Sequence, residues 1–223
     1  MVKKELKSKH SVILVYTLVF YGIWSFWEFW GNGVISCAVA DKLLAQFIKS
    51  GIVKGLIWTL PAVCLVRHYQ DDVYVQLKQM FTNRVNILKY IPVFIGFSVY
   101  LVLGAFVVKS GLAISESFNL SDLVVVLFVG ITEEMVFRGW LLNGTVNKDS
   151  IWLPVVINAL LFLLIHFPIW IKSGQIIDII VSLNFLAVPI LSVIFSWTFL
   201  KSKSIWIPIV LHMYWDLFIL LFY

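Results

Sequence analysis

Two adjacent carboxylates and an arginine, Glu133, Glu134 and Arg138, stand in a stretch of chain that is otherwise apolar. Charged side chains are costly in the hydrocarbon of a membrane, so ionisable residues in such a segment indicate a functional site. Residues four apart share one face of a helix, which pairs Glu134 with Arg138. Glu133 is turned by about 100° from Glu134 and has no such local partner. Glu133 is therefore the candidate general base, able to take a proton from water.

Further polar residues lie in two later apolar segments. His166 follows Phe162 by one helical turn, and Pro168 removes an amide from the helix beside it, which predicts a kink there. His212 precedes Asp216 by one turn on the same face. We expect these residues to converge with the unpaired glutamate, because sites in helical bundles are built from facing helices. The predicted reaction class is hydrolysis of an amide or ester in or beside the membrane.

Several roles are open to this cluster. The candidate ligands for a divalent metal such as Zn²⁺ are Glu133, His166, His212 and Asp216. The histidines could instead hold the attacking water or stabilise an oxyanion, and Asp216 could fix the tautomer of a histidine. With neutral histidines, three carboxylates face one arginine, so a bound metal, a protonated carboxyl group or a protonated histidine should balance the surplus. Taken singly, each residue could also be a structural hydrogen-bonding group.

The composition excludes an ordinary soluble domain. Hydrophobic residues make up 61% of the chain, charged residues 13%, and the mean hydropathy is +0.96. The net charge of +5 comes from basic residues that flank apolar segments, which is typical of membrane proteins and not of nucleic-acid binding. We predict a single all-α membrane domain over residues 1–223, with a catalytic core over residues 121–223.

The apolar segments predict a polytopic protein with about six or seven transmembrane helices: Ser11–Trp30, Gly51–Val66, Tyr90–Val108, Ser121–Leu142, Ile151–Ile171, Ile176–Leu200 and Ser204–Tyr223. The second is the weakest, and we expect it to begin near Asp41 as part of a longer helix. Asp71–Lys89 mixes charged and apolar residues and is predicted to be an interfacial amphipathic helix. The distribution of lysine and arginine predicts a cytoplasmic N-terminus. The short chain, rich in lysine, isoleucine and phenylalanine, favours a bacterial plasma membrane.

Three motifs in order resemble the CPBP family of CAAX-processing and bacteriocin-processing intramembrane proteases, also called the Abi family. The EExxxR motif matches Glu133, Glu134 and Arg138, the FxxxH motif matches Phe162 and His166, and the histidine followed by a polar residue four positions later matches His212 and Asp216. The resemblance covers roughly residues 121–223. Asp216 departs from the commonest form of the third motif, which has asparagine.

The resemblance implies a helical membrane metalloendopeptidase in which the first glutamate and a histidine activate water; a metal-free glutamate mechanism has also been proposed for the family. It implies that the second glutamate and the arginine support the site. The expected substrate is a membrane-associated peptide or protein, in peptide maturation or bacteriocin self-immunity. The alternatives are a non-catalytic membrane immunity or binding protein and a small ion transporter. The sequence does not indicate an oligomeric state.

Overall fold

The computed structural model describes residues 2–109, 111–147 and 150–223, and every regular element in these ranges is a helix, as predicted. Five helices are long and apolar enough to cross a membrane: Lys9–Ala38, Lys42–His68, Ile87–Val108, Trp152–Lys172 and Asn184–Ser202. A shorter apolar helix, Trp206–Phe222, ends the chain. The chain is thus a polytopic membrane protein.

The N-terminal part forms two long continuous helices. The first helix (residues 2–38) comprises α1 (Val2–Phe26), a π-helical segment η1 (Trp27–Gly31) and α2 (Asn32–Ala38). The second helix (residues 42–68) comprises α3 (Lys42–Gln46), the π-helical segments η2 (Phe47–Val53) and η3 (Gly55–Thr59), and α4 (Leu60–His68). The second helix begins where the side chain of Asp41 accepts the backbone N–H of Leu44 at 2.7 Å. The weak second span therefore does belong to a longer helix.

A third continuous helix carries the acidic pair and the arginine, and we call it the charged helix (residues 120–145). It comprises α7 (Leu120–Glu134), the π-helical segment η5 (Met135–Leu142) and α8 (Asn143–Thr145). It begins with a capping box formed by Asn119 and Asp122. The side chain of Asp122 accepts the backbone N–H of Asn119, and the side chain of Asn119 accepts the backbone N–H of Ser121.

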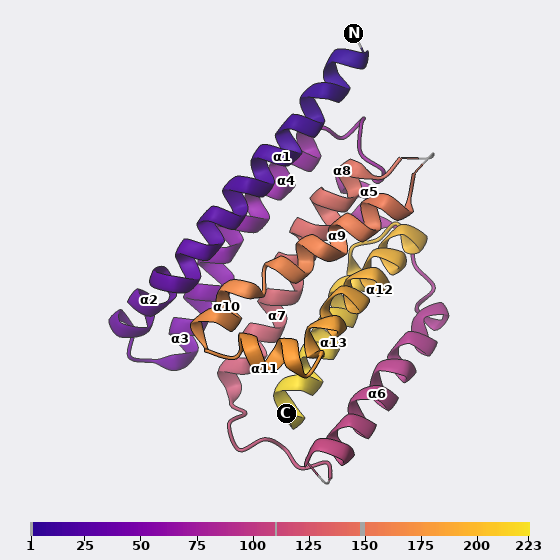
Figure 1. The fold of residues 1–223 in the computed structure, drawn as a ribbon. Coiled ribbons are helices and arrows are strands. Elements are labelled where there is room, and N and C mark those ends of the chain that lie inside the picture. The colour runs from indigo at the N-terminus through magenta and orange to yellow at the C-terminus, as the bar shows by residue number, and fades with distance from the viewer. Residues whose placement is uncertain (1, 110, 148–149) are drawn as a thin grey trace.

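The charged helix lies at the centre of the bundle. Figure 1 shows α7 between the first and second helices on one side and the pair α12 (Ala187–Ser202) and α13 (Trp206–Phe222) on the other. All eight residues of η5 are buried. Aromatic rings of the first and second helices, among them Phe20 and Trp58, form a cluster with Phe137 of η5. The charges are therefore tolerated because protein, not lipid, surrounds them.

The other elements complete the bundle: α5 (Leu77–Thr82), the 3₁₀-helix η4 (Ile87–Tyr90), α6 (Ile91–Lys109), α9 (Trp152–Leu164), α10 (Phe167–Lys172), α11 (Ile176–Val181) and the 3₁₀-helix η6 (Asn184–Leu186). Helix α6 lies at the outer edge of the bundle (Figure 1), where it packs on α13. Its uniformly apolar sequence fits a position with much of its surface toward lipid.

The expected interfacial helix over Asp71–Lys89 is reduced to α5, six residues long, and to the start of the 3₁₀-helix η4. The preceding backbone is held by the side chain and carbonyl of Asn143 instead of by helical hydrogen bonds. The Val75 N–H donates to Asn143 Oδ1 at 2.7 Å, and the Asn143 amide donates back to the Val75 carbonyl at 2.9 Å. These bonds fasten the loop to the end of the charged helix, a tertiary effect that the local pattern does not contain.

The expected continuous span Ile176–Leu200 is also interrupted. Leu183 has a left-handed φ of 60° and separates α11 from η6 and α12. A left-handed residue cannot continue a right-handed helix, so the membrane-length helix begins only at Asn184.

Candidate active site

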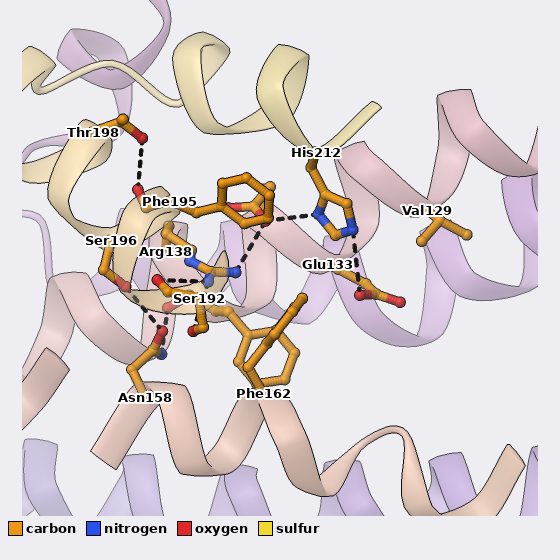
Figure 2. A network of polar contacts seen from close by, with 12 residues as sticks. Val129, Glu133, Arg138, Asn158, Phe162, Ser192, Phe195, Ser196, Thr198 and His212 are labelled. Atoms are coloured by element: carbon orange, nitrogen blue, oxygen red, sulfur yellow. Dashed lines mark hydrogen bonds and ion pairs between the residues drawn. The ribbon is translucent and has the colours of Figure 1, made fainter. Parts of the chain in front are cut away.

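The predicted pair between Glu134 and Arg138 is present and completely buried. Arg138 Nη1 donates to Glu134 Oε1 at 2.9 Å, and both side chains are 0% exposed. Arg138 Nη2 donates to the backbone carbonyl and to the hydroxyl of Ser192, at 3.0 and 2.7 Å. The guanidinium lies over the ring of Phe162, 4.5 Å from its centre. Figure 2 shows the arginine enclosed by these groups from α9 and α12, so it ties three helices together.

Glu134 has a second partner that the sequence did not predict. His212 Nδ1 donates to the same Oε1 atom at 2.8 Å. The role of fixing the tautomer of His212, which we offered to Asp216, therefore belongs to Glu134. The other ring nitrogen of the histidine, Nε2, lies 4.0 Å from Glu133 Oε2 (Figure 2). It also lies 3.5 Å from Asp216 Oδ2. Glu134 thus directs Nε2 toward the carboxylates of Asp216 and Glu133.

A glycine one turn before Glu134 allows this contact. A Cβ atom at Gly130 would lie 2.7 Å from Met213 Cγ and 3.4 Å from the backbone oxygen of Ile209. Helices α7 and α13 approach closely there because no side chain separates them, as at many interfaces between membrane helices. This approach brings His212 against the charged helix.

Replacing Gly130 with valine should therefore separate α7 from α13 and disconnect His212 from Glu134. We expect lower folded yield and loss of any activity that depends on His212, because overpacking at such a contact typically costs about 1–3 kcal/mol. Thermal melting of the purified protein and cleavage of a reporter peptide would measure both effects. The matched control is Gly22→Val, because a Cβ at Gly22 meets nothing within 4 Å. Equal behaviour of the two variants would contradict the role of Gly130.

His166 occupies the predicted break in its helix. Helix α9 ends at Leu164 and α10 begins at Phe167, with Pro168 in its first turn. His166 Nδ1 lies 2.9 Å from the Phe162 carbonyl, which accepts its proton and leaves Nε2 as an acceptor. Trp24 of the first helix donates to the carbonyl of Ile165 at 2.7 Å, which satisfies a backbone group at the break.

Glu133 and His166 line one cavity of about 250 Å³, to which the first and second helices also contribute Glu28, Lys49 and Lys54. Because a buried water needs roughly 10–15 Å³ of such space, the cavity has room for a water and for part of a larger ligand. Larger hollows, of about 680, 480 and 460 Å³, lie elsewhere and have mostly apolar linings. The smaller cavity, with its ionisable residues, is therefore the candidate active site.

Other polar residues support the charged helix, and sequence analysis did not single them out. The Asn158 amide donates to the carbonyl of Phe137 within η5 at 2.8 Å, and Ser196 donates to Asn158 at 3.5 Å (Figure 2). Asn158, Ser192 and Ser196 are each buried in an apolar helix. A polar residue in the middle of an apolar segment was the only signal that could have identified them.

The arrangement of the candidate ligands does not fit a metal ion. Among the residues that the structure describes, no three histidine, cysteine, aspartate or glutamate side chains are placed to hold one. His166 and His212 each use Nδ1 in a hydrogen bond within the protein, so Nε2 is the nitrogen of each ring that could reach a metal. The open Nε2 of His212 is nearer to Asp216 than to Glu133, at 3.5 against 4.0 Å, so the donors do not surround a common point at bonding distance.

The fold and the site together define a helical membrane protein with a buried carboxylate–histidine centre. Residues 116–218 match the family described as type II CAAX prenyl endopeptidase Rce1-like. The matched segment contains all three motifs, which confirms the resemblance to the CAAX proteases. The family is one of intramembrane endopeptidases. No curated protein and no solved structure shows a significant match to the chain.

Proposed function

We propose that this protein is an intramembrane endopeptidase that hydrolyses a peptide bond of a membrane-associated peptide or protein. One observation carries the proposal: Glu133 and His166 line a common cavity, and His212 Nε2 lies 4.0 Å from Glu133. These residues come from three different helices. They bring an acceptor for a water proton together with two imidazoles, the groups that water-activated peptide hydrolysis needs.

In the proposed reaction, a water held between Glu133 and Nε2 of His166 attacks the carbonyl carbon of the substrate. Glu133 takes one proton from the water as the new C–O bond forms and the carbonyl oxygen becomes negative. When the C–N bond breaks, the oxygen re-forms the carbonyl and the proton passes from Glu133 to the departing amine. His212, beside Glu133, is placed to steady the water or the negative oxygen.

Three residues position the reacting groups without touching the substrate in this proposal. Glu134 fixes the orientation of His212, and Arg138 holds Glu134 in place. Phe162 contributes its carbonyl to His166 and its ring to the guanidinium of Arg138. The second motif thus links the histidine of α9 to the charged helix. Asp216 Oδ2 lies 3.5 Å from His212 Nε2, so this histidine has three carboxylates around it, those of Glu133, Glu134 and Asp216.

Because the donors do not fit a metal ion as they are arranged, the proposed steps use only groups of this chain. The substrate proposed for a bacterial plasma membrane is a peptide pheromone, a bacteriocin precursor or another membrane-associated protein. We further propose that the cleavage serves bacteriocin maturation or self-immunity. The family match supports the endopeptidase activity itself.

The direct test compares the membrane-associated peptides of cells that carry the wild-type chain or Glu133→Gln. Glutamine keeps the size of the side chain but cannot take up the proton. We expect a set of cleaved ends that is present with the wild type and absent with the variant, while both proteins reach the membrane in equal amounts. Peptide mass spectrometry identifies the ends and so supplies a reporter substrate.

Persistent cleavage by purified Glu133→Gln would overturn the assignment of the base. If the variant is inactive and still protects cells from a bacteriocin, the non-catalytic immunity function is favoured over maturation. Asp178→Asn is a matched control, because it makes the same carboxylate-to-amide change at an exposed residue of α11, away from the cavity.

A further inference from the structure

Lys54 is the one cavity-lining cation that faces the catalytic groups without a hydrogen bond. It lies between the two π-helical segments of the second helix. Its ammonium nitrogen is 4.7 Å from the centre of the Trp24 ring and 5.0 Å from that of Trp58. Within residues 2–109, 111–147 and 150–223 it makes no hydrogen bond or ion pair within 4 Å. Two indole faces therefore hold the charge and leave its N–H groups to the cavity.

Lys54 shares its cavity with two carboxylates, those of Glu133 and Glu28. Glu133, Glu28 and, more weakly, Asp216 act electrostatically on its ammonium group. Lys49, five residues earlier and on the same cavity, is engaged differently, because its ammonium group donates to Ser36 Oγ at 2.6 Å. The two lysines thus share a helix and a cavity but differ in whether they are free to act on the site.

The charge balance indicates what Lys54 does. With neutral histidines, Glu133, Glu134 and Asp216 give −3, and Arg138 alone leaves −2. Glu28 and Lys49, which also line the cavity, cancel each other in charge. Lys54 reduces this surplus to −1. An asparagine at position 216, as in the commonest form of the motif, would bring the sum to zero. A surplus of negative charge opposes both an ionised base and the negative oxygen that the reaction forms.

We propose that Lys54 is a positioning residue for catalysis: it is the resident cation of the cavity and compensates for the extra carboxylate of Asp216. It keeps Glu133 available as a carboxylate and lowers the cost of the developing oxyanion. Lys54 thereby fills the role that sequence analysis offered to a bound metal. This inference deepens the proposed function, and its kinetic part depends on that function.

A double-mutant cycle tests the proposal. We expect Lys54→Met to lower kcat for the reporter peptide by at least about tenfold, with a smaller change in KM. In the Asp216→Asn background the same substitution should cost no more than about twofold, because the two changes then cancel in charge. Lys54→Arg, which keeps the charge, should recover most of the loss. Lys42→Met is the matched control, because it removes an exposed lysine of the same long helix outside the cavity, and it should leave kcat within about twofold of the wild type.

Thermal melting of the same proteins gives a second measurement, the Tm, which does not depend on catalysis. Lys54→Met should lower Tm in the wild type and have little effect in Asp216→Asn. Equal losses in both backgrounds, in melting and in kcat, would overturn the proposal, as would a stoichiometric divalent metal in active purified protein. If Glu133→Gln proves active, the proposed function fails, and the Tm values of the double-mutant cycle still decide whether Lys54 compensates for the charge of Asp216. If Asp216→Asn is inactive, kcat cannot be compared in that background and the Tm values alone decide the question.

Discussion

Replacing Arg138 with alanine is expected to leave little folded protein in the membrane. The substitution removes the hydrogen bond to Glu134 and both bonds to Ser192, in surroundings where both members of the pair are 0% exposed. Removal of one partner from a buried ion pair costs about 3–5 kcal/mol, which is a large part of the stability of a typical domain. Folded yield after extraction in mild detergent, together with Tm, measures the effect.

Conservative variants separate charge from geometry at this pair. Arg138→Lys keeps the charge but loses the planar fork that reaches Glu134 and Ser192 together, so its Tm should fall between those of the wild type and Arg138→Ala. Glu134→Gln should also be destabilised, because it leaves the guanidinium without its counter-charge. A wild-type Tm for Arg138→Ala would show that the three helices do not depend on this arginine.

The second large effect is the loss of cleavage on removal of either histidine. His166→Ala and His212→Ala should each reduce the rate by about 10²–10⁴-fold, the contribution typical of acid–base groups. They should differ in stability. His212→Ala removes a donor from Glu134, whose other oxygen is already buried without a hydrogen-bond partner. His166→Ala frees only the Phe162 carbonyl. We therefore expect a clear fall in Tm for His212→Ala and a small one for His166→Ala.

His68→Ala is the control for these variants, because His68 is exposed at the end of α4. It should retain both activity and Tm. Cleavage of the reporter peptide and melting of each purified protein give the comparison. If either site variant cuts at the wild-type rate, the corresponding histidine has no part in the reaction. If the two variants melt alike, the bond from Glu134 to His212 contributes little to the fold.

Features that depend on local pattern were predictable from the sequence. Apolar length predicted five helices that are long enough to cross a membrane and a shorter sixth, Trp206–Phe222, whereas the expected span Ser121–Leu142 is not among them. The spacing of four residues predicted the bond from Arg138 to Glu134, and Pro168 predicted the break at His166. The ordered motifs predicted the family of the C-terminal part. Each of these inferences uses residues within one helix, where geometry follows from spacing alone.

Features that depend on how helices meet were not predictable in this way. Glu134 reaches His212 across 78 positions of sequence, and Ser192 reaches Arg138 across 54. Lys54 lies in the weakest of the predicted spans, and the pattern of that segment gives no reason to place it at the site. Its proximity to the site follows from the packing of α7 against η2 and η3. The loop held by Asn143 and the turn at Leu183 likewise depend on contacts outside the local pattern.

The π-helical segments have a consequence for how the gene can change. Hydrogen bonds in a π-helix join residues five apart instead of four, so such a segment resembles an α-helix into which a residue has been inserted. Loss of one codon within Met135–Leu142 would let an α-helix form there with nearly the same total turn, so the chain after it would keep its direction. Asn143, at the far end, would still face the loop that it fastens. Loss of one codon within the α-helical part, Leu120–Glu134, would instead turn everything after it by about 100°. We therefore expect selection to eliminate single-codon deletions in α7 more strictly than single-codon deletions in η5.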